Sequence, residues 1–260
     1  MRDVIKSSLA AMCDRKLLIL HVLLNAVLCT AGAFWLLVPD EHGWQILATV
    51  VSALALLLMA VWLHAGTLAY CARGRVRTQA GFGRALWQGL AFLIVVAVMF
   101  WLADRVSHWS ESSSQISGYV YSKLPGFRRA LTYSRLESWT ESLFLALRLY
   151  VVPGLLLPLA AAAAAFGFSG KLRRGLCALG CWRYWLWLVV LILLGVEVPR
   201  LLIYWSPAGT LRFETISVVL RLLGAYLLIV LCWLAACGML GKLVADRVES
   251  AGKSGGKAAR

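Results

Sequence analysis

The sequence predicts an all-α, polytopic membrane protein that crosses the bilayer six times. Of its 260 residues, 61% are hydrophobic and 15% are charged, and the mean hydropathy is +0.78. A soluble domain is only about half apolar. The charges cluster between six apolar runs, each close to the roughly 20 residues that a helix needs to cross the bilayer core. The runs lie at 17–38, 46–70, 85–103, 143–168, 184–205 and 215–240.

The distribution of basic residues predicts the orientation of the chain. Seventeen of the 26 Lys and Arg, but only four of the 12 acidic residues, lie in 1–16, 71–84, 169–183 and 241–260. The intervening segments hold six basic and seven acidic residues, and they are 39–45, 104–142 and 206–214. Basic loops stay in the cytoplasm. We therefore expect both termini to be cytoplasmic and 104–142 to form a large outside loop.

The net charge of +14 also bears on partners and location. Its basic cytoplasmic face predicts attraction to anionic lipid headgroups. Nucleic-acid binding is not expected, because the sequence offers no folded basic domain that would present a groove-reading element. The charged first 16 residues predict no cleavable signal. The sequence has 19 Arg and 7 Lys, and this preference for Arg is typical of a GC-rich bacterial genome. We therefore expect the protein to lie in the inner (plasma) membrane of a bacterial cell.

The seven cysteines predict neither a disulfide framework nor a metal site. All of them lie in spans or in predicted cytoplasmic segments, whereas disulfides form on the oxidising side. Cys177 and Cys181 are spaced i, i+4, but the paired CxxC spacing of zinc sites is absent. We expect no cofactor.

Internal similarities predict three tandem hairpins, each preceded by a short amphipathic helix at the cytoplasmic surface. ESLFLALRL (141–149) resembles ETISVVLRL (214–222), and IKSSLAAMCDRKLL (5–18) resembles LRRGLCALGCWRYW (172–185). FGRALWQGL (82–90) is a weaker third copy of the second motif. Such helices sink an apolar face into the headgroup region. Chance alignment of Leu- and Ala-rich spans remains the alternative.

The remaining segments complete the predicted organisation. Residues 1–245 are expected to form one six-span membrane domain. The small, polar and basic segment 246–260 is expected to be a disordered cytoplasmic tail. Within the outside loop, the serine-rich stretch 107–118 predicts a flexible start, and 125–139 predicts a helix after a Pro-Gly turn.

Four charged residues inside the last three spans form the predicted site: Arg148, Glu197, Arg200 and Arg221. All lie roughly 7–12 Å below the predicted outer boundary at 1.5 Å per residue. Glu197 and Arg200 are i, i+3 on one helix and can pair. Pro199 frees the carbonyl of Gly195 and loosens the turn. Three interpretations of the cluster are open. Its charges pair and hold the helices together, its arginines snorkel outward to the headgroups, or it binds an anionic group such as a lipid phosphate.

One further segment resembles a known catalytic motif. GFSG (167–170) resembles the nucleophile segment of rhomboid intramembrane proteases, which need a histidine on a later span. The histidines lie earlier, at 21, 42, 64 and 108, which excludes that class. His21 and His64 are interpreted as hydrogen-bonded packing residues.

The sequence therefore favours a non-enzymatic membrane protein that organises or assists a membrane partner. The alternative is a small transporter or lipid-handling protein that binds an anionic group at the charge cluster. An outer-face enzyme would need Glu137, Glu141 or Glu197 as an acid or base, and only the proximity of these residues supports it.

Overall fold

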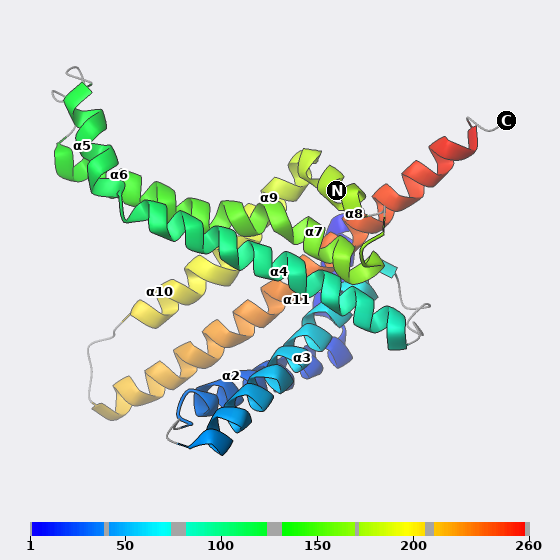
Figure 1. Ribbon diagram of the computed structural model, residues 1–260, viewed down its shortest axis with the longest axis horizontal. Helices are drawn as coiled ribbons and strands as arrows, with labels where there is room; N and C mark the ends of the chain where they lie inside the picture. The colour runs from blue at the N-terminus through cyan, green and yellow to red at the C-terminus, as the bar shows by residue number, and fades with distance from the viewer. Residues whose placement is uncertain are drawn as a thin grey trace. The chain divides into compact units, whose positions relative to one another are not determined.

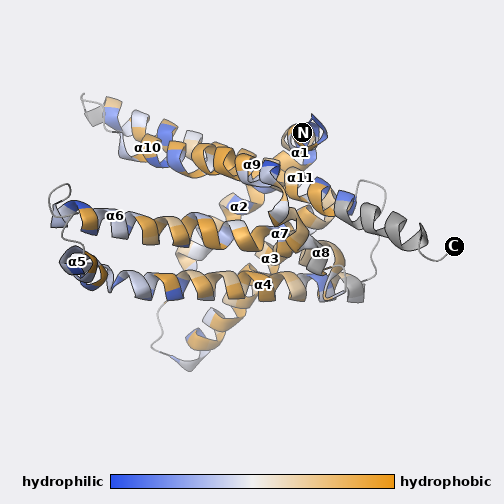
Figure 2. Ribbon diagram, turned by 90° about the horizontal axis from the view of Figure 1, so that it is seen from above, coloured by the Kyte–Doolittle hydropathy of each residue, from blue (hydrophilic) through white to orange (hydrophobic). Residues whose placement is uncertain are grey.

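A computed structural model describes residues 2–38, 42–73, 82–123, 132–169, 172–205 and 211–257 (Figure 1). Nearly all of these residues are helical, and none of them lies in a β-strand. Six helical segments are long and apolar enough to cross a membrane, and hydrophobic residues dominate them (Figure 2). They are Arg15–Trp35, Gly43–Arg73, Ala85–Ser110, Tyr133–Phe166, Trp182–Tyr204 and Phe213–Asp246. Each coincides with a predicted run, so the prediction of an all-α polytopic membrane protein is confirmed.

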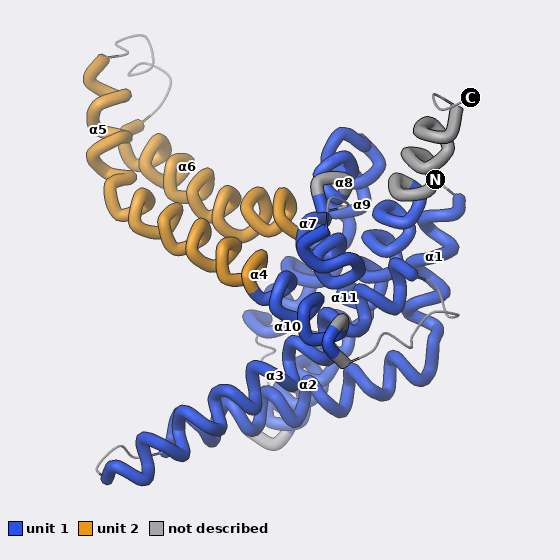
Figure 3. Tube along the Cα trace, turned by 45° about the vertical axis from the view of Figure 1, so that its right-hand side comes forward, with its two compact units in different colours: residues 1–93, 158–260 blue, residues 94–157 orange. Residues whose placement is uncertain are grey.

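The chain divides into two compact units (Figure 3). Unit 1 contains residues 1–93 and 158–260, and unit 2 contains residues 94–157. The sequence-based expectation of one six-span membrane domain over 1–245 stays a prediction. Hydropathy registers only whether a segment is apolar, and it carries no information on which apolar helices pack together.

Helix α11 (Leu211–Lys257) contacts most of the other helices of unit 1. Two glycines on α11 allow two of these neighbours to approach its backbone closely. A Cβ on Gly238 would lie 2.6 Å from the carbonyl oxygen of Ser7 on α1 (Arg2–Met12). A Cβ on Gly241 would lie 2.5 Å from the carbonyl carbon of Cys71 on α3 (Gly43–Arg73). Only glycine fits at such distances, because real Cβ contacts are longer.

Helix α1 presents two different faces. Val4, Ser8 and Ala11 are buried, and the Ser7 hydroxyl donates a hydrogen bond to the Gly238 carbonyl at 2.9 Å. On the predicted apolar face, Leu9 is 52% exposed, whereas Ile5 and Met12 are partly buried. Asp14 then caps α2 (Arg15–Trp35) by accepting a hydrogen bond from the backbone N–H of Lys16 at 3.2 Å.

Helix α7 (Val152–Phe166) carries the run of six alanines, all of which are at most 4% exposed. Small side chains permit close helix packing within a membrane. The C-terminal end of α7 is held by side chains of two other helices. Arg73 of α3 donates from Nε to the Ala165 carbonyl at 2.9 Å and also from Nη2. Gln88 of α4 (Phe82–Ser110) donates to the same oxygen at 3.2 Å.

Unit 2 contains helices over most of the predicted outside loop, 104–142. Helix α4 continues to Ser110, and α5 (Ser113–Lys123) and α6 (Tyr133–Ala146) follow. The expectation of a flexible stretch at 107–118 is therefore wrong. Ser117 donates a hydrogen bond to Thr140 at 2.9 Å, and the Tyr133 hydroxyl donates to the Ser114 carbonyl at 3.1 Å. The predicted helix at 125–139 is present from Tyr133 onward, while 124–131 lies outside the described residues.

Two spans contain a π-helical turn that ends two residues before a proline. The turn η2 (Leu147–Val151) joins α6 to α7 and precedes Pro153. The turn η4 (Leu193–Glu197) joins α9 (Trp182–Ile192) to α10 (Val198–Tyr204) and precedes Pro199. Proline lacks an N–H and disturbs the preceding turn, so the widened turn accommodates it. Each π-turn contains a residue of the predicted charge cluster, Arg148 in η2 and Glu197 in η4.

The predicted amphipathic helices are present before two of the three hairpins. Helix α1 precedes α2 and α3, and a short helical segment, α8 (Leu172–Leu176) with the 3₁₀ turn η3 (Cys177–Gly180), precedes α9. Residues 82–90 form the first part of α4 itself, and 74–81 lies outside the described residues. The repeat itself stays a prediction. Local backbone geometry does not follow it, since Arg148 lies in a π-turn and Arg221 in the regular helix α11.

Helix α11 includes most of the segment 246–260, for which the sequence predicts a disordered tail. Helix α11 continues through 246–257 and ends at Lys257. No proline interrupts this stretch, and Lys242 forms an i, i+4 ion pair with Asp246 at 2.7 Å. The predicted disorder of 246–260 stays a prediction, and 258–260 lies outside the described residues.

Candidate functional site

The structure places Glu197 beside Arg200, as their i, i+3 spacing predicts. A Glu197 carboxylate oxygen lies 3.8 Å from an Arg200 guanidinium nitrogen. The Glu197 side chain is 30% exposed and that of Arg200 is 57% exposed. Gly195 in the same π-turn packs against α11, where a Cβ would lie 2.8 Å from the Cβ of Cys232. The turn thus brings the acidic residue to the α11 interface, while Arg200 faces outward.

Arg221 on α11 binds the end of α10. Its Nη1 donates to the Leu202 carbonyl at 3.4 Å, and its Nε donates to the Ser217 carbonyl at 3.2 Å. The guanidinium carbon lies 5.8 Å from the ring centre of Trp205. A cation near the last carbonyls of a helix interacts favourably with the helix dipole. Arg221 therefore fastens α10 to α11.

Arg148 belongs to unit 2, whereas the other three charged residues belong to unit 1. Its Nη1 donates to the Ser107 hydroxyl at 3.3 Å and so links η2 to α4. Among the described contacts, Glu197 and Arg200 are the two members of the predicted cluster that meet. Arg148 and Arg221 have local partners of their own. The predicted ligand-binding role of all four residues stays a prediction.

The loose geometry of the Glu197–Arg200 pair predicts a small energetic contribution. Glu197→Gln should lower the free energy of unfolding of the detergent-solubilised protein by about 1 kcal/mol or less, as for other partly exposed ion pairs. Thermal unfolding should show no more loss in Glu197→Gln plus Arg200→Gln than in either single variant. Glu141→Gln, an exposed carboxylate on α6, is the matched control. A strictly additive double variant would show that the two side chains are not coupled.

The structure also assembles a polar cluster that the sequence analysis treated as two separate histidines. His21 of α2 and His64 of α3 have ring centres 5.7 Å apart, and His64 lies 5.2 Å from the ring centre of Trp233 on α11. His21 is fully buried, and its Nε2 lies 2.8 Å from the hydroxyl of Thr67. Three helices of unit 1 therefore share one buried polar cluster.

Hydrogen bonds in this cluster assign the tautomer of His21. The Thr67 hydroxyl donates its single proton to the Leu63 carbonyl at 2.7 Å. It must therefore accept from His21, so the Nε2 atom of His21 carries a proton. The side-chain amide of Asn25 then donates to His21 Nδ1 at 3.3 Å. A neutral His21 has both nitrogens satisfied, which agrees with its interpretation as a hydrogen-bonded packing residue.

This arrangement predicts that Thr67 is important for stability. Thr67→Val keeps the shape of the side chain but leaves the buried Nε2–H of His21 without an acceptor, which should cost about 1–3 kcal/mol. Thr49→Val is the matched control on the same helix, because the Thr49 hydroxyl only donates to the Gln45 carbonyl, at 2.8 Å. Thermal unfolding in detergent checks the comparison. Equal losses in the two variants would contradict the assigned hydrogen bond.

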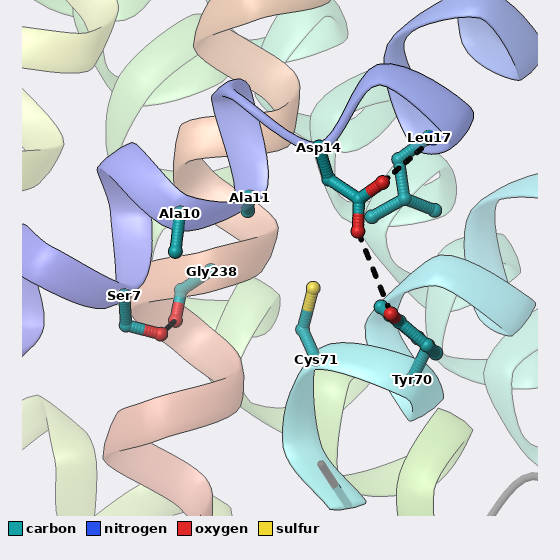
Figure 4. Close-up of a pocket in the computed structure, with 8 residues that line it drawn as sticks. All are labelled: Ser7, Ala10, Ala11, Asp14, Leu17, Tyr70, Cys71 and Gly238. Atoms are coloured by element: carbon teal, nitrogen blue, oxygen red, sulfur yellow. Dashed lines mark hydrogen bonds between the residues drawn. The ribbon is translucent and has the colours of Figure 1, made fainter. Parts of the chain in front are cut away.

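A pocket of about 160 Å³ lies where α1, the start of α2, α3 and α11 meet (Figure 4). Asp14, Tyr70 and Cys71 face one another across it. The Tyr70 hydroxyl donates to the Asp14 carboxylate at 3.5 Å. The other lining residues are Ser7, Ala10, Ala11, Leu17 and Gly238. Sequence reasoning missed this pocket, because its polar groups come from segments more than 50 residues apart.

No group of three or more metal-ligating side chains occurs among the described residues. Cys177 and Cys181 are free thiols in the structure. The chain as a whole matches no protein family model, no curated protein and no solved structure. The site must therefore be interpreted from its own geometry.

Proposed function

We propose that the chain is a non-enzymatic, multi-pass membrane protein that organises or assists a membrane partner. The supporting observation is the length of the helices in and around unit 2. Helix α4 has 29 residues, and the segment Tyr133–Phe166 has 34. At 1.5 Å per residue these helices measure about 43 and 51 Å, whereas the hydrocarbon core of a bilayer is about 30 Å thick. Both therefore have more than 10 Å of helix to extend beyond the core.

The surplus helix belongs to a structured projection, which we define as residues 101–123 and 133–146. Three of its aromatic side chains are at least 60% exposed: Trp109, Tyr119 and Trp139. Tryptophan and tyrosine are enriched in the buried centres of protein–protein interfaces. An ordered surface of this kind presents aromatic anchors to a partner at a lower entropic cost than a flexible loop does. We assign partner binding to this projection.

Photo-crosslinking in the native membrane tests this assignment. A photoreactive amino acid at position 109 or 139 should form a discrete adduct with one other membrane protein, identified by mass spectrometry. Position 44 on α3 is the matched control, because Trp44 is 68% exposed but belongs to unit 1. Adducts at positions 109 and 139 with lipid alone would identify these residues as membrane anchors. That result would contradict the partner-binding proposal.

The proposed orientation places the projection outside the cell inner membrane and both termini in the cytoplasm. The basic loops favour this arrangement, and they would hold the cytoplasmic face against anionic headgroups. Single cysteines in an otherwise cysteine-free background should react with an impermeant maleimide in intact cells at position 115 and not at position 177, where the native Cys177 is exposed. Reaction at both positions, or at 177 alone, would contradict the orientation.

A lipid-handling function is the second candidate, and the exposure of Arg200 favours it. More than half of this side chain is free of protein contact, at the surface that also holds Arg221 over Trp205. A headgroup phosphate matches the fork of donors on a guanidinium. Arg200→Gln should then reduce retention of anionic lipid in native mass spectra. Arg105→Gln, an exposed arginine on α4, should leave retention unchanged.

A further inference from the structure

The pocket between α1, α2, α3 and α11 lies at the ends of two membrane spans. Asp14 directly precedes the span Arg15–Trp35, and Tyr70 and Cys71 come three and two residues before the end of the span Gly43–Arg73. At 1.5 Å per residue along the helix axes, all three residues lie within about 5 Å of the span ends. The polar headgroups of a bilayer lie at this level. A group held in the pocket is therefore within reach of lipid headgroups, whichever end of the protein faces the cytoplasm.

The side-chain oxygens that line the pocket are committed to act as hydrogen-bond acceptors. The Tyr70 hydroxyl donates its single proton to the Asp14 carboxylate at 3.5 Å, and the Ser7 hydroxyl donates its own to the Gly238 carbonyl at 2.9 Å. Both hydroxyl oxygens then offer lone pairs to a ligand. Asp14 is the one charged residue among the described lining residues, and an ionised carboxylate only accepts. The pocket thus matches a cation that donates several hydrogen bonds.

The volume of the pocket selects a small cation of this kind. If each heavy atom takes the roughly 30 Å³ of a water molecule, the pocket of about 160 Å³ holds a group of about five heavy atoms. An aminoethyl ester group fits within this size, and its ammonium carries three N–H donors. A trimethylammonium group is larger, has no N–H to donate and is typically recognised by a cage of aromatic rings. Tyr70 is the one aromatic residue in the described lining, so the pocket favours a primary over a quaternary ammonium.

We propose that the pocket is a binding site for a primary ammonium group at the membrane surface. The ammonium donates to the Asp14 carboxylate and to the hydroxyl oxygens of Tyr70 and Ser7. Two kinds of molecule bring such a group to this level, namely a phospholipid with an ethanolamine headgroup and a water-soluble alkylamine. The lipid fits better, because its phosphodiester lies one ethylene unit from the ammonium, and two exposed basic residues, Arg15 and Lys16, directly follow Asp14. The site is separate from the projection and from Arg200, to which the functions proposed above are assigned.

Native mass spectrometry of the full chain tests the proposal. The purified protein is incubated in detergent with equal amounts of phosphatidylethanolamine and phosphatidylcholine that have the same acyl chains. The wild type should retain phosphatidylethanolamine in preference to phosphatidylcholine. Asp14→Asn still caps α2, but it should reduce this preference roughly tenfold or more, because it removes the hydrogen bond between two charged groups. Asp3→Asn is the matched control, because Asp3 is exposed on α1 and does not line the pocket.

A second variant and a second probe complete the test. Ala10→Leu enlarges a lining side chain, keeps the carboxylate and should also remove the preference, so it decides the question if size exclusion shows that Asp14→Asn is not folded. Ethylamine is then titrated into the protein in phosphatidylcholine nanodiscs. Binding that Asp14→Asn abolishes, together with equal retention of the two lipids by the wild type, assigns the site to a water-soluble amine. The proposal is overturned if the wild type retains both lipids equally and binds no ethylamine, or if either folded variant keeps the wild-type binding.

Discussion

Replacing Gly241 with alanine should destabilise the detergent-solubilised protein clearly, although the change adds a single methyl group. The new Cβ would lie 2.5 Å from the carbonyl carbon of Cys71 and 2.7 Å from its oxygen. These are backbone atoms of α3, so the neighbour cannot rotate away as a flexible side chain would. Overpacking of this kind typically costs about 1–3 kcal/mol. Thermal unfolding monitored by size exclusion measures the loss.

Gly224→Ala on the same helix is the matched control for this prediction. No atom lies within 4 Å of the Cβ that would be added at Gly224. Alanine is the better helix former by about 1 kcal/mol, so this variant should be neutral or slightly more stable. The two glycine-to-alanine changes should thus have opposite signs. Equal effects would mean that α3 and α11 do not meet at Gly241 as the structure shows.

Arg73→Gln should also produce a large loss of stability, because Arg73 binds the C-terminal end of the buried alanine helix. The variant removes two hydrogen bonds from a charged group to the Ala165 carbonyl. Hydrogen bonds to charged groups contribute about 1.5–3 kcal/mol. The positive charge of Arg73 also interacts favourably with the negative, C-terminal end of the helix dipole. Gln88 would remain as the other side chain that donates to this oxygen. Urea or thermal unfolding in detergent gives the measurement.

Arg73→Lys tests which property of the side chain matters. Lysine keeps the charge but cannot present two donors in a fixed fork, so its loss should lie between those of the wild type and Arg73→Gln. Arg105→Gln is the control for charge removal alone, because Arg105 is exposed and stacks on Trp101. If Arg105→Gln cost as much as Arg73→Gln, the interaction with α7 would not be the source of the effect.

The six spans were predictable from the sequence for a physical reason. A segment that crosses a bilayer must satisfy its backbone hydrogen bonds internally, so a long apolar run is sufficient evidence for a helix. The projection was not predictable in this way. Its helices lie among serines and charges, and contacts such as Ser117 with Thr140 join residues that are far apart in the sequence. Composition alone favoured a flexible stretch at 107–118.

In the candidate site, too, contacts between neighbouring residues were predictable from the sequence and contacts between distant residues were not. The pairing of Glu197 with Arg200 follows from their i, i+3 spacing on one helix. The partners of Arg221 and His21 lie 19 and 46 residues away, so only the packing of the helices reveals them. The two π-turns share a local sequence pattern. Both precede a Val-Pro pair, at 152–153 and 198–199, and each begins with a leucine five residues before the valine.

The close contacts at Gly238 and Gly241 hold α11 against α1 and α3 near one point along its length. The helix is uninterrupted over 47 residues and measures about 70 Å. From Gly238 it extends about 40 Å toward Leu211 and about 29 Å toward Lys257 at 1.5 Å per residue. Tilting a rigid rod about this point moves its two ends in opposite directions, with displacements in a ratio of about 3 to 2. A force that tilted α11 about this point would therefore displace both of its ends.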